Sequence, residues 1–112
     1  METYDAVTAL CGIAQSTRLE IFRLLVRHGP SGLPAGRIGG ELNLPNATLS
    51  FHLAQLKHAG LVTCRREGRS LVYAANFEAM NSLLAYLTEN CCREGEDACA
   101  PGSFEASSAA AG

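Results

Sequence analysis

The chain has 112 residues, of which 47% are hydrophobic and 18% charged, a composition typical of one small globular domain and not of a disordered segment. No apolar run approaches the roughly 20 residues that span a bilayer, and no basic segment followed by an apolar one opens the chain, so we expect a cytoplasmic protein with no membrane partner. Residues 1–70 hold eight Lys or Arg and five Asp or Glu, whereas residues 71–112 hold one Arg and six acids. The basic excess favours contact with nucleic-acid phosphates in the first part.

Apolar residues recur at helical spacing near the start of the chain, which predicts a first helix over residues 3–13. The residues that define this apolar face are Tyr4, Val7, Leu10 and Ala14. Cys11 lies next to the face, and we expect it to be a buried packing residue, because a free cysteine packs as a small hydrophobe.

A second helix is heavily apolar and is expected to lie in the core. Ser16 or Thr17 can cap its N-terminus, and with Thr17 as the N-cap, Glu20 completes a capping box. A third, short helix begins near Pro34. Packing must stabilise it, since glycines within it cost about 1 kcal/mol each relative to alanine.

The stretch from Asn46 to Gly60 predicts an amphipathic helix, in which Leu49, Leu53 and Leu56 form one apolar face. Short polar or basic side chains that can reach base edges in a DNA major groove occupy other positions. These are Thr48, Ser50, His52, Gln55 and Lys57. The same pattern is also typical of an ordinary solvated helix. The preceding short helix and turn favour the first interpretation, because together they give the helix-turn-helix layout.

Two β-prone runs follow at residues 61–67 and 70–74, and the glycine-containing turn between them predicts a hairpin. The tip of this hairpin carries Arg65, Arg66 and Arg69. A helix-turn-helix followed by a basic hairpin is a winged helix. The expected fold is therefore mainly α with a β-hairpin wing.

Asn76 can cap a last helix whose apolar residues alternate three and four apart in a heptad-like seam. The seam consists of Phe77, Met80, Leu84, Leu87 and Cys91. So wide an apolar face must be buried, either on its own monomer or in a dimer together with the first helix. We assign residues 1–92 to a DNA-binding and dimerisation domain and residues 93–112 to a cysteine-containing, largely flexible tail.

Three segments in this order resemble the ArsR/SmtB family of winged-helix repressors, and the resemblance covers roughly residues 4–92. The segments are Thr17–Leu25, Leu49–Val62 and Arg66–Arg69. The resemblance implies a homodimer through the first and last helices, which presents two recognition helices to two half-sites of double-stranded operator DNA. At the dimer interface we expect Val7, Leu10, Leu84 and Leu87. For DNA contacts we expect Asn46, Thr48, Ser50, His52, Arg65, Arg66 and Arg69.

Two effector sites of family members are missing from this chain. The third helix has no cysteine where several members carry Cys-x-Cys, and the last helix has no His or Asp where zinc-sensing members place their ligands. Neither site can be carried over to this sequence.

Three cysteines near the C-terminus form a different candidate site. Cys91 and Cys92 are adjacent, so on a helix their side chains would lie about 100° apart and reach one ion together, with Cys99 returning through a loop. Three soft thiolates favour As(III) or Sb(III), which takes three sulfur ligands, over zinc, which prefers four. The set is similar in position to that of some arsenic-responsive family members. Cys64, in the hairpin, is expected to be a packing residue.

These observations predict an As(III)-responsive repressor that is not an enzyme, has no permanently bound cofactor, and takes no organic ligand except methylated arsenicals. Two alternatives of the same fold are another soft-metal sensor and a redox sensor, in which Cys91 or Cys92 forms a disulfide with Cys99. The neighbouring acids disfavour the reactive thiolate that a redox sensor needs. A thiol-dependent arsenic enzyme is a third alternative, but the sequence lacks an anion-binding loop beside a cysteine.

Overall fold

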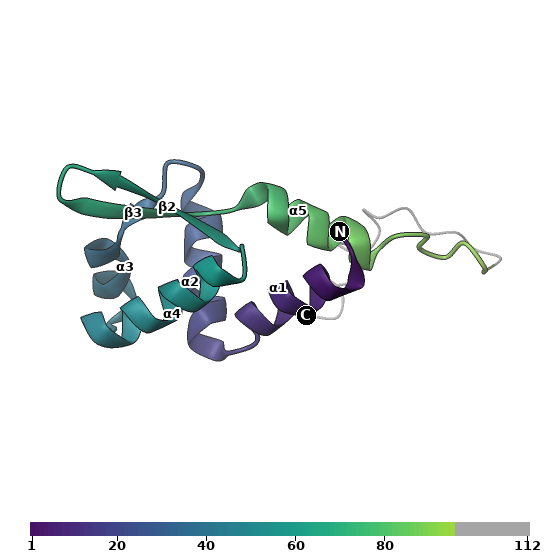
Figure 1. Ribbon diagram of the computed structural model, residues 1–112, viewed down its shortest axis with the longest axis horizontal. Helices are drawn as coiled ribbons and strands as arrows, with labels where there is room; N and C mark the ends of the chain where they lie inside the picture. Colours follow the sequence, from purple (N-terminus) through teal and green to yellow (C-terminus); the bar gives the residue numbers. More distant parts are fainter. Residues whose placement is uncertain (96–112) are drawn as a thin grey trace.

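The computed structural model describes residues 1–95, and within this range the chain forms five helices and three strands (Figure 1). The helices are α1 (Thr3–Ile13), α2 (Ser16–His28), α3 (Ala35–Leu42), α4 (Asn46–His58) and α5 (Phe77–Leu87). The strands are β1 (Leu33–Pro34), β2 (Val62–Glu67) and β3 (Ser70–Ala75). The expected fold, mainly α with a β-hairpin wing, is confirmed. None of the helices within residues 1–95 is long and apolar enough to cross a membrane.

The core lies between α2, α3 and α4 and extends to the start of β2. The most deeply buried large side chains are Ile21, Leu25, Ile38, Leu49, Leu53, Leu56 and Leu61. Each contributes roughly 1.5–3 kcal/mol relative to an exposed position. The predicted apolar face of α4 is therefore the face that attaches this helix to the rest of the domain.

A three-residue turn joins α3 to α4. Asn43 caps α3 in the left-handed conformation at φ 55°, which asparagine tolerates better than most residues. The Leu44 amide then donates a hydrogen bond of 2.9 Å to the Gly39 carbonyl, and Pro45 opens α4 in extended geometry. The short turn holds the two helices in the predicted helix-turn-helix arrangement.

The wing is part of a three-stranded antiparallel sheet with the strand order β1-β3-β2. In the hairpin, Cys64 faces Tyr73 and Arg65 faces Val72. Strand β1, in which Leu33 pairs with Tyr73 of β3, was not predicted from the sequence. A strand of two residues is too short to show the alternation by which strands are recognised.

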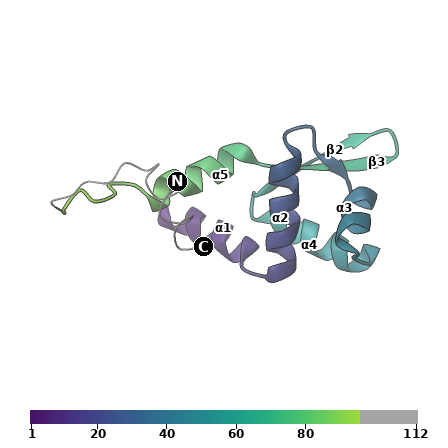
Figure 2. The same cartoon turned by 180° about the vertical axis from the view of Figure 1, so that it is seen from behind.

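Helices α1 and α5 lie side by side at one end of the molecule, opposite the β2–β3 hairpin, in both views (Figures 1 and 2). The hydroxyl groups of Thr3 and Tyr86 share a hydrogen bond between the two helices. Helix α1 also crosses the end of α4, where a Cβ on Gly12 would lie 2.4 Å from the Cβ of Ala59. Because glycine has no Cβ, α1 can approach the end of α4 closely.

Two local predictions in the first two helices are wrong. The N-cap of α2 is Gln15, whose side chain accepts a hydrogen bond of 2.9 Å from the Arg18 amide, so Ser16 and Thr17 lie inside the first turn. Cys11 is exposed and not buried, because α1 turns Ala6 and Ala9 toward the core. The predicted capping of α5 by Asn76 is confirmed by the 3.1 Å hydrogen bond that its side chain accepts from the Ala79 amide.

Candidate nucleic-acid interface and thiol site

The outward face of α4 carries most of the residues predicted to read bases. Asn46, Thr48 and Ser50 are exposed. His52 is half-buried on the flank of the helix, and its Nδ1 is out of contact with solvent and has no hydrogen-bond partner within residues 1–95. Beside it lies Phe51, which is 59% exposed and was not among the predicted DNA contacts. The spacing of Phe51 from the predicted apolar face already indicates its exposure, since residues two apart on a helix lie about 200° apart.

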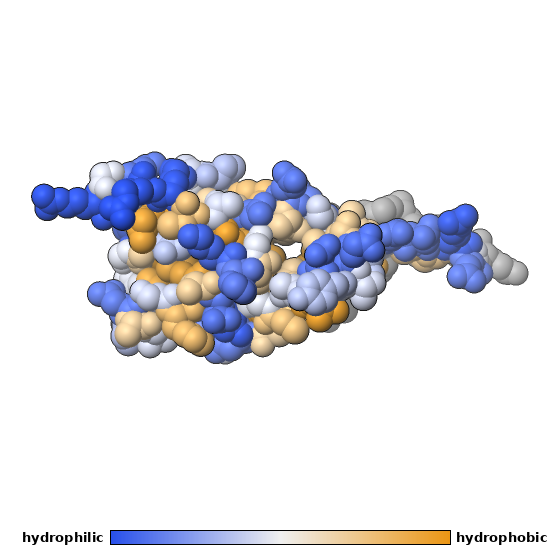
Figure 3. Space-filling view, viewed as in Figure 1, coloured by the Kyte–Doolittle hydropathy of each residue, from blue (hydrophilic) through white to orange (hydrophobic). Residues whose placement is uncertain are grey.

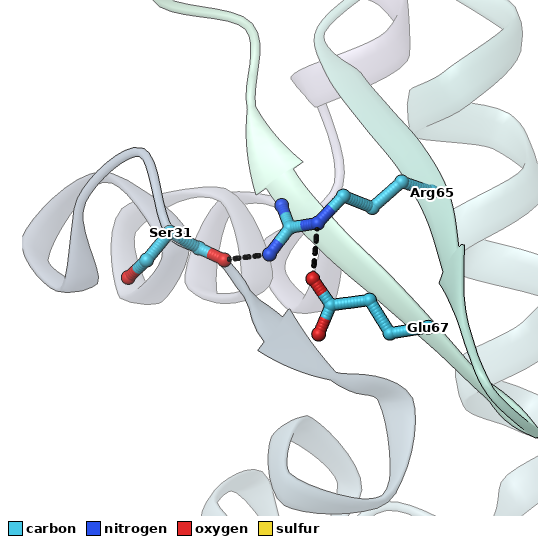
Figure 4. Close-up of polar contacts among 3 residues, drawn as sticks. All are labelled: Ser31, Arg65 and Glu67. Atoms are coloured by element: carbon cyan, nitrogen blue, oxygen red, sulfur yellow. Dashed lines mark hydrogen bonds and ion pairs between the residues drawn. The ribbon is translucent and has the colours of Figure 1, made fainter.

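The arginines of the wing differ in their surroundings. Arg65 Nε lies 2.6 Å from Glu67 Oε2, and its Nη2 donates to the Ser31 carbonyl at 2.6 Å (Figure 4). Arg65 and Glu67 meet because residues two apart share one face of a strand. Arg66 and Arg69 are exposed and form no ion pair within residues 1–95. Hydrophilic side chains accordingly project at the end of the molecule where the hairpin lies (Figure 3).

Exposed apolar side chains gather on α1 and α5, and we call them the α1–α5 surface. They are Tyr4 (80% exposed), Val7 (51%), Leu10 (39%), Leu84 (53%) and Leu87 (55%). The four predicted interface residues all lie in this set. The other part of the predicted seam, Phe77 and Met80, is half-buried against the core of its own monomer. Helix α5 therefore anchors on the domain through its first turns and leaves later apolar residues uncovered within residues 1–95.

The two adjacent cysteines lie just beyond α5. The prediction that they sit on the helix is wrong, because α5 ends at Leu87 and turns follow, with Asn90 at φ 59° and Cys92 at φ 60°. The turns nevertheless bring the sulfurs of Cys91 and Cys92 to 3.5 Å from each other. Cys99 lies outside the described residues. Within residues 1–95, no group of three or more His, Cys, Asp or Glu could hold a metal ion.

Cys64 is half-buried in the wing opposite Tyr73. Partial burial is the largest cause that raises the pKa of the Tyr73 hydroxyl above its ordinary value. The Cys64 side chain raises it further, through a hydrogen bond and through its negative charge when ionised. This thiol lies in the sheet, with Tyr73 as its neighbour, as expected of a packing residue.

A helix-turn-helix domain family matches residues 13–65. The chain is 30% identical to the transcriptional activator HlyU of Vibrio cholerae over 88 residues, and this aligned region covers 79% of each protein. Among solved structures, an ArsR-like transcriptional regulator from Rhodococcus has a TM-score of 0.68 at 24% identity, over 81% of this chain and 82% of that one. A possible transcriptional regulator for arsenical resistance has a TM-score of 0.62 at 28% identity, over 70% and 79%.

A homodimeric winged helix-turn-helix DNA-binding domain from Mycobacterium bovis, a possible ArsR-family regulator, has a TM-score of 0.62 at 24% identity, over 85% of this chain and 88% of that one. The fold and these relatives define a winged helix-turn-helix transcriptional regulator, which is not an enzyme. More particularly, the chain belongs to the ArsR/SmtB family, as the sequence predicted.

Proposed function

We propose that this regulator is a dimeric repressor that binds operator DNA and releases it when trivalent arsenic binds C-terminal thiolates. The observation that carries the proposal is the 3.5 Å separation of the Cys91 and Cys92 sulfurs at the end of α5. Sulfurs that share one tetrahedral zinc ion at about 2.3 Å lie roughly 3.8 Å apart, and a three-coordinate pyramid with narrower angles brings them closer. Two thiolates in this arrangement need little movement to bind one small ion.

The third ligand in the proposal is Cys99. Three thiolates without a fourth ligand suit As(III), and the similar Sb(III), better than zinc. The likeness to a possible regulator for arsenical resistance supports this choice of effector. Methylated As(III) has only two exchangeable positions, so Cys91 and Cys92 alone suffice for it.

DNA binding in the proposal uses two copies of α4 and two wings. Ser50 and Thr48 contact base edges, and the arginines contact phosphates. A second copy of the chain covers the α1–α5 surface, as the homodimeric state of a winged helix-turn-helix domain of similar fold supports. The proposal keeps the cytoplasmic location that the sequence predicts, because such a regulator acts where the DNA is.

The effector must act on DNA through the dimer, since metalloid binding changes operator affinity only if it favours a geometry that fits the operator less well. The contacts within one chain offer a physical connection. The cysteines follow α5, α5 contacts α1 through Tyr86 and Thr3, and α1 contacts the end of α4 through Gly12. A shift of α5 that carries α1 with it would therefore also move the end of α4.

A second candidate effector is an oxidant, which would join Cys91 or Cys92 to Cys99 in a disulfide. In that step the two thiols lose two electrons and two protons to hydrogen peroxide, which is reduced to two molecules of water. Cys91 and Cys92 are adjacent, and consecutive Cα atoms lie closer together than the Cα atoms of a usual disulfide, which favours Cys99 as the partner. Activation in place of repression is a further alternative, because the similar protein HlyU is a transcriptional activator.

One titration separates these functions. Operator DNA, recovered by selection from a random pool, is released by arsenite, methylarsenite or antimonite at stoichiometric concentration if the proposal holds. Zinc, cadmium and hydrogen peroxide are the comparison effectors. Release by peroxide alone would identify a redox sensor, and release by zinc or cadmium alone would identify another soft-metal sensor.

A further inference from the structure

Phe51 is a large apolar side chain in the middle of α4 that the described residues leave uncovered. It is 59% exposed, although Leu49, Leu53 and Leu56 on the same helix are each 2% exposed or less. Successive residues turn by about 100°, so Phe51 lies about 200° around the helix from Leu49, on the side opposite the core. It is thus separate from the α1–α5 surface and stands on the helix that enters DNA in the proposed function.

The neighbours of Phe51 on this face are small. Ala47 lies one turn before it and Ala54 one turn after it, and both are exposed. Small side chains allow the helix backbone to approach the floor of a groove, which leaves the phenyl ring as the most protruding apolar group. Helix α4 also contains no Asp or Glu that would repel phosphates.

The Phe51 ring contacts the ring of the neighbouring His52. It meets the ring of His52 edge-on, with the centroids 5.5 Å apart and the planes at 66°. His52 is half-buried, so the ring that contacts Phe51 is itself partly enclosed by the domain, while most of the Phe51 ring remains exposed. A partner that covers the exposed part meets an apolar surface already in place.

We propose that Phe51 reads thymine, by packing its ring against the C5-methyl group of one thymine in each operator half-site. The thymine methyl is the apolar group that the major groove presents, and phenylalanine is among the side chains that contact it. The inference rests on the proposed function in one respect, namely that α4 enters the major groove. It adds a specificity determinant that acts by apolar contact, beside the hydrogen bonds of Ser50.

The experiment removes the methyl group from DNA and leaves the base pair intact. Full-length protein first selects its operator from a random duplex pool. Each thymine of the half-sites is then replaced by deoxyuridine, in one half-site or at the equivalent position of both. At one position, affinity falls about fourfold for one half-site and about 15-fold for both, which is the effect of one buried methyl group each. Other thymines outside the contact give no change.

Variants assign the effect to the side chain. Phe51→Ala binds thymine and deoxyuridine operators equally, whereas Phe51→Leu keeps part of the preference. Leu19→Ala is the matched control, because Leu19 is another exposed apolar side chain, 44% exposed, and lies on α2 outside the proposed DNA-binding elements. It keeps the full preference for thymine.

Each failure has its own meaning. If no deoxyuridine substitution weakens the wild-type protein, or if Phe51→Ala retains the full preference, the thymine contact is wrong while DNA binding stands. If the selection enriches no sequence, reading of the groove by α4 is wrong, and the proposed operator function fails with it. A normal arsenite response with no thymine preference would overturn this inference alone.

Discussion

The three arginines of the β2–β3 hairpin differ in what their guanidinium groups contact. Arg65 is bonded to Glu67 and to the Ser31 carbonyl, whereas Arg66 and Arg69 extend from the wing without an ion pair within residues 1–95. Both partners of the Arg65–Glu67 pair are about half exposed, at 47% and 57%, and exposed pairs contribute only about 0–1 kcal/mol. A DNA phosphate can therefore replace Glu67 at small cost.

Arg69→Ala should weaken binding to all DNA sequences alike. Removing one phosphate contact lowers the slope of log affinity against log salt by about one for each half-site. Binding measured over a salt series checks this expectation. The control is Arg93→Ala, which removes the same charge beyond α5, far from the wing in the chain. Unchanged affinity and unchanged salt slope in Arg69→Ala would show that the wing does not contact phosphate.

Ser50→Ala should change sequence preference and not general affinity. Ser50 is exposed on α4, the proposed recognition helix. Loss of its hydrogen bond to a base edge relaxes discrimination by about 1–3 kcal/mol at one base pair. Competition between the selected operator and its single-base variants measures this change. Asn81→Ala, an exposed polar change on α5, should leave the preference intact. Equal discrimination by wild type and Ser50→Ala would contradict the assignment.

The thiols should not be equivalent. Cys91→Ser or Cys92→Ser removes one member of the pair whose sulfurs lie 3.5 Å apart, and should abolish release of DNA by both arsenite and methylarsenite. Cys99→Ser removes only the third ligand and should reduce the arsenite response more than the methylarsenite response. DNA affinity without effector should stay unchanged in all three variants, as an operator-binding titration will show.

Cys11→Ser is the control for these thiol variants, since Cys11 is exposed on α1 and its replacement leaves the core intact. It should respond like the wild type. A Cys91→Ser protein that still releases DNA normally with arsenite would refute the proposed site and direct attention to Cys11 and Cys64.

At the scale of elements, the sequence predicted the helices and the hairpin because periodic burial determines them. The leucines of α4 repeat with the helical period, and their spacing is enough to identify the buried face. What periodicity could not reveal is which partner covers a face. In α1 the monomer buries Ala6 and Ala9, while the larger Val7 and Leu10 remain exposed, so Cys11 was placed on the wrong side.

The end of α5 could not be predicted for a different reason. The heptad-like spacing continues through Leu87 to Cys91, but the helix ends at Leu87, before the cysteines. The Thr88 hydroxyl donates to the Leu84 carbonyl at 2.8 Å, and Asn90 then adopts the left-handed conformation. The two thiols meet through turn geometry. The sulfurs of Cys91 and Cys92 therefore lie close together, but through turns and not on a helix, and their role as ligands stays a prediction.

Leu84→Glu should convert the protein to monomers and reduce operator binding to the weak residual affinity of a single half-site contact. Leu84 is 53% exposed in the monomer, so its burial by a second copy contributes roughly 0.8–1.6 kcal/mol from each protomer, about half the value for a fully exposed side chain, and a buried carboxylate reverses this gain. Sedimentation measures the oligomeric state. Leu19→Glu is the matched control, because Leu19 is 44% exposed on α2, outside the α1–α5 surface. Normal dimers of Leu84→Glu would show that α5 is not the interface.

On the scale of the whole molecule, the base-reading helix and the thiols occupy different elements, and α1 lies between them. Helix α1 contacts α5 through the Thr3–Tyr86 hydrogen bond and α4 through the close approach of Gly12 to Ala59. The same helix supplies Val7 and Leu10 to the α1–α5 surface. A dimer formed through this surface therefore links both thiol pairs and both recognition helices in one assembly.

Thermodynamic linkage predicts a relation between the affinity of the dimer for arsenite and its affinity for the operator. If arsenite weakens operator affinity by a certain factor, the operator must weaken arsenite affinity by the same factor. A coupling of about 1–3 kcal/mol corresponds to roughly 5–150-fold in each direction. Arsenite titrations of the free dimer and of the operator-bound dimer, and operator titrations with and without arsenite, give two values that should agree.

Leu84→Glu tests whether this coupling needs the dimer. The variant keeps Cys91 and Cys92, so the monomer should still bind methylarsenite, which requires only that pair. Because it lacks the second recognition helix, its residual DNA affinity should be the same with and without methylarsenite. If the monomer instead loses DNA on binding methylarsenite by the factor measured for the dimer, the coupling lies within one chain, through α5, α1 and α4, and the dimer geometry plays no part in it.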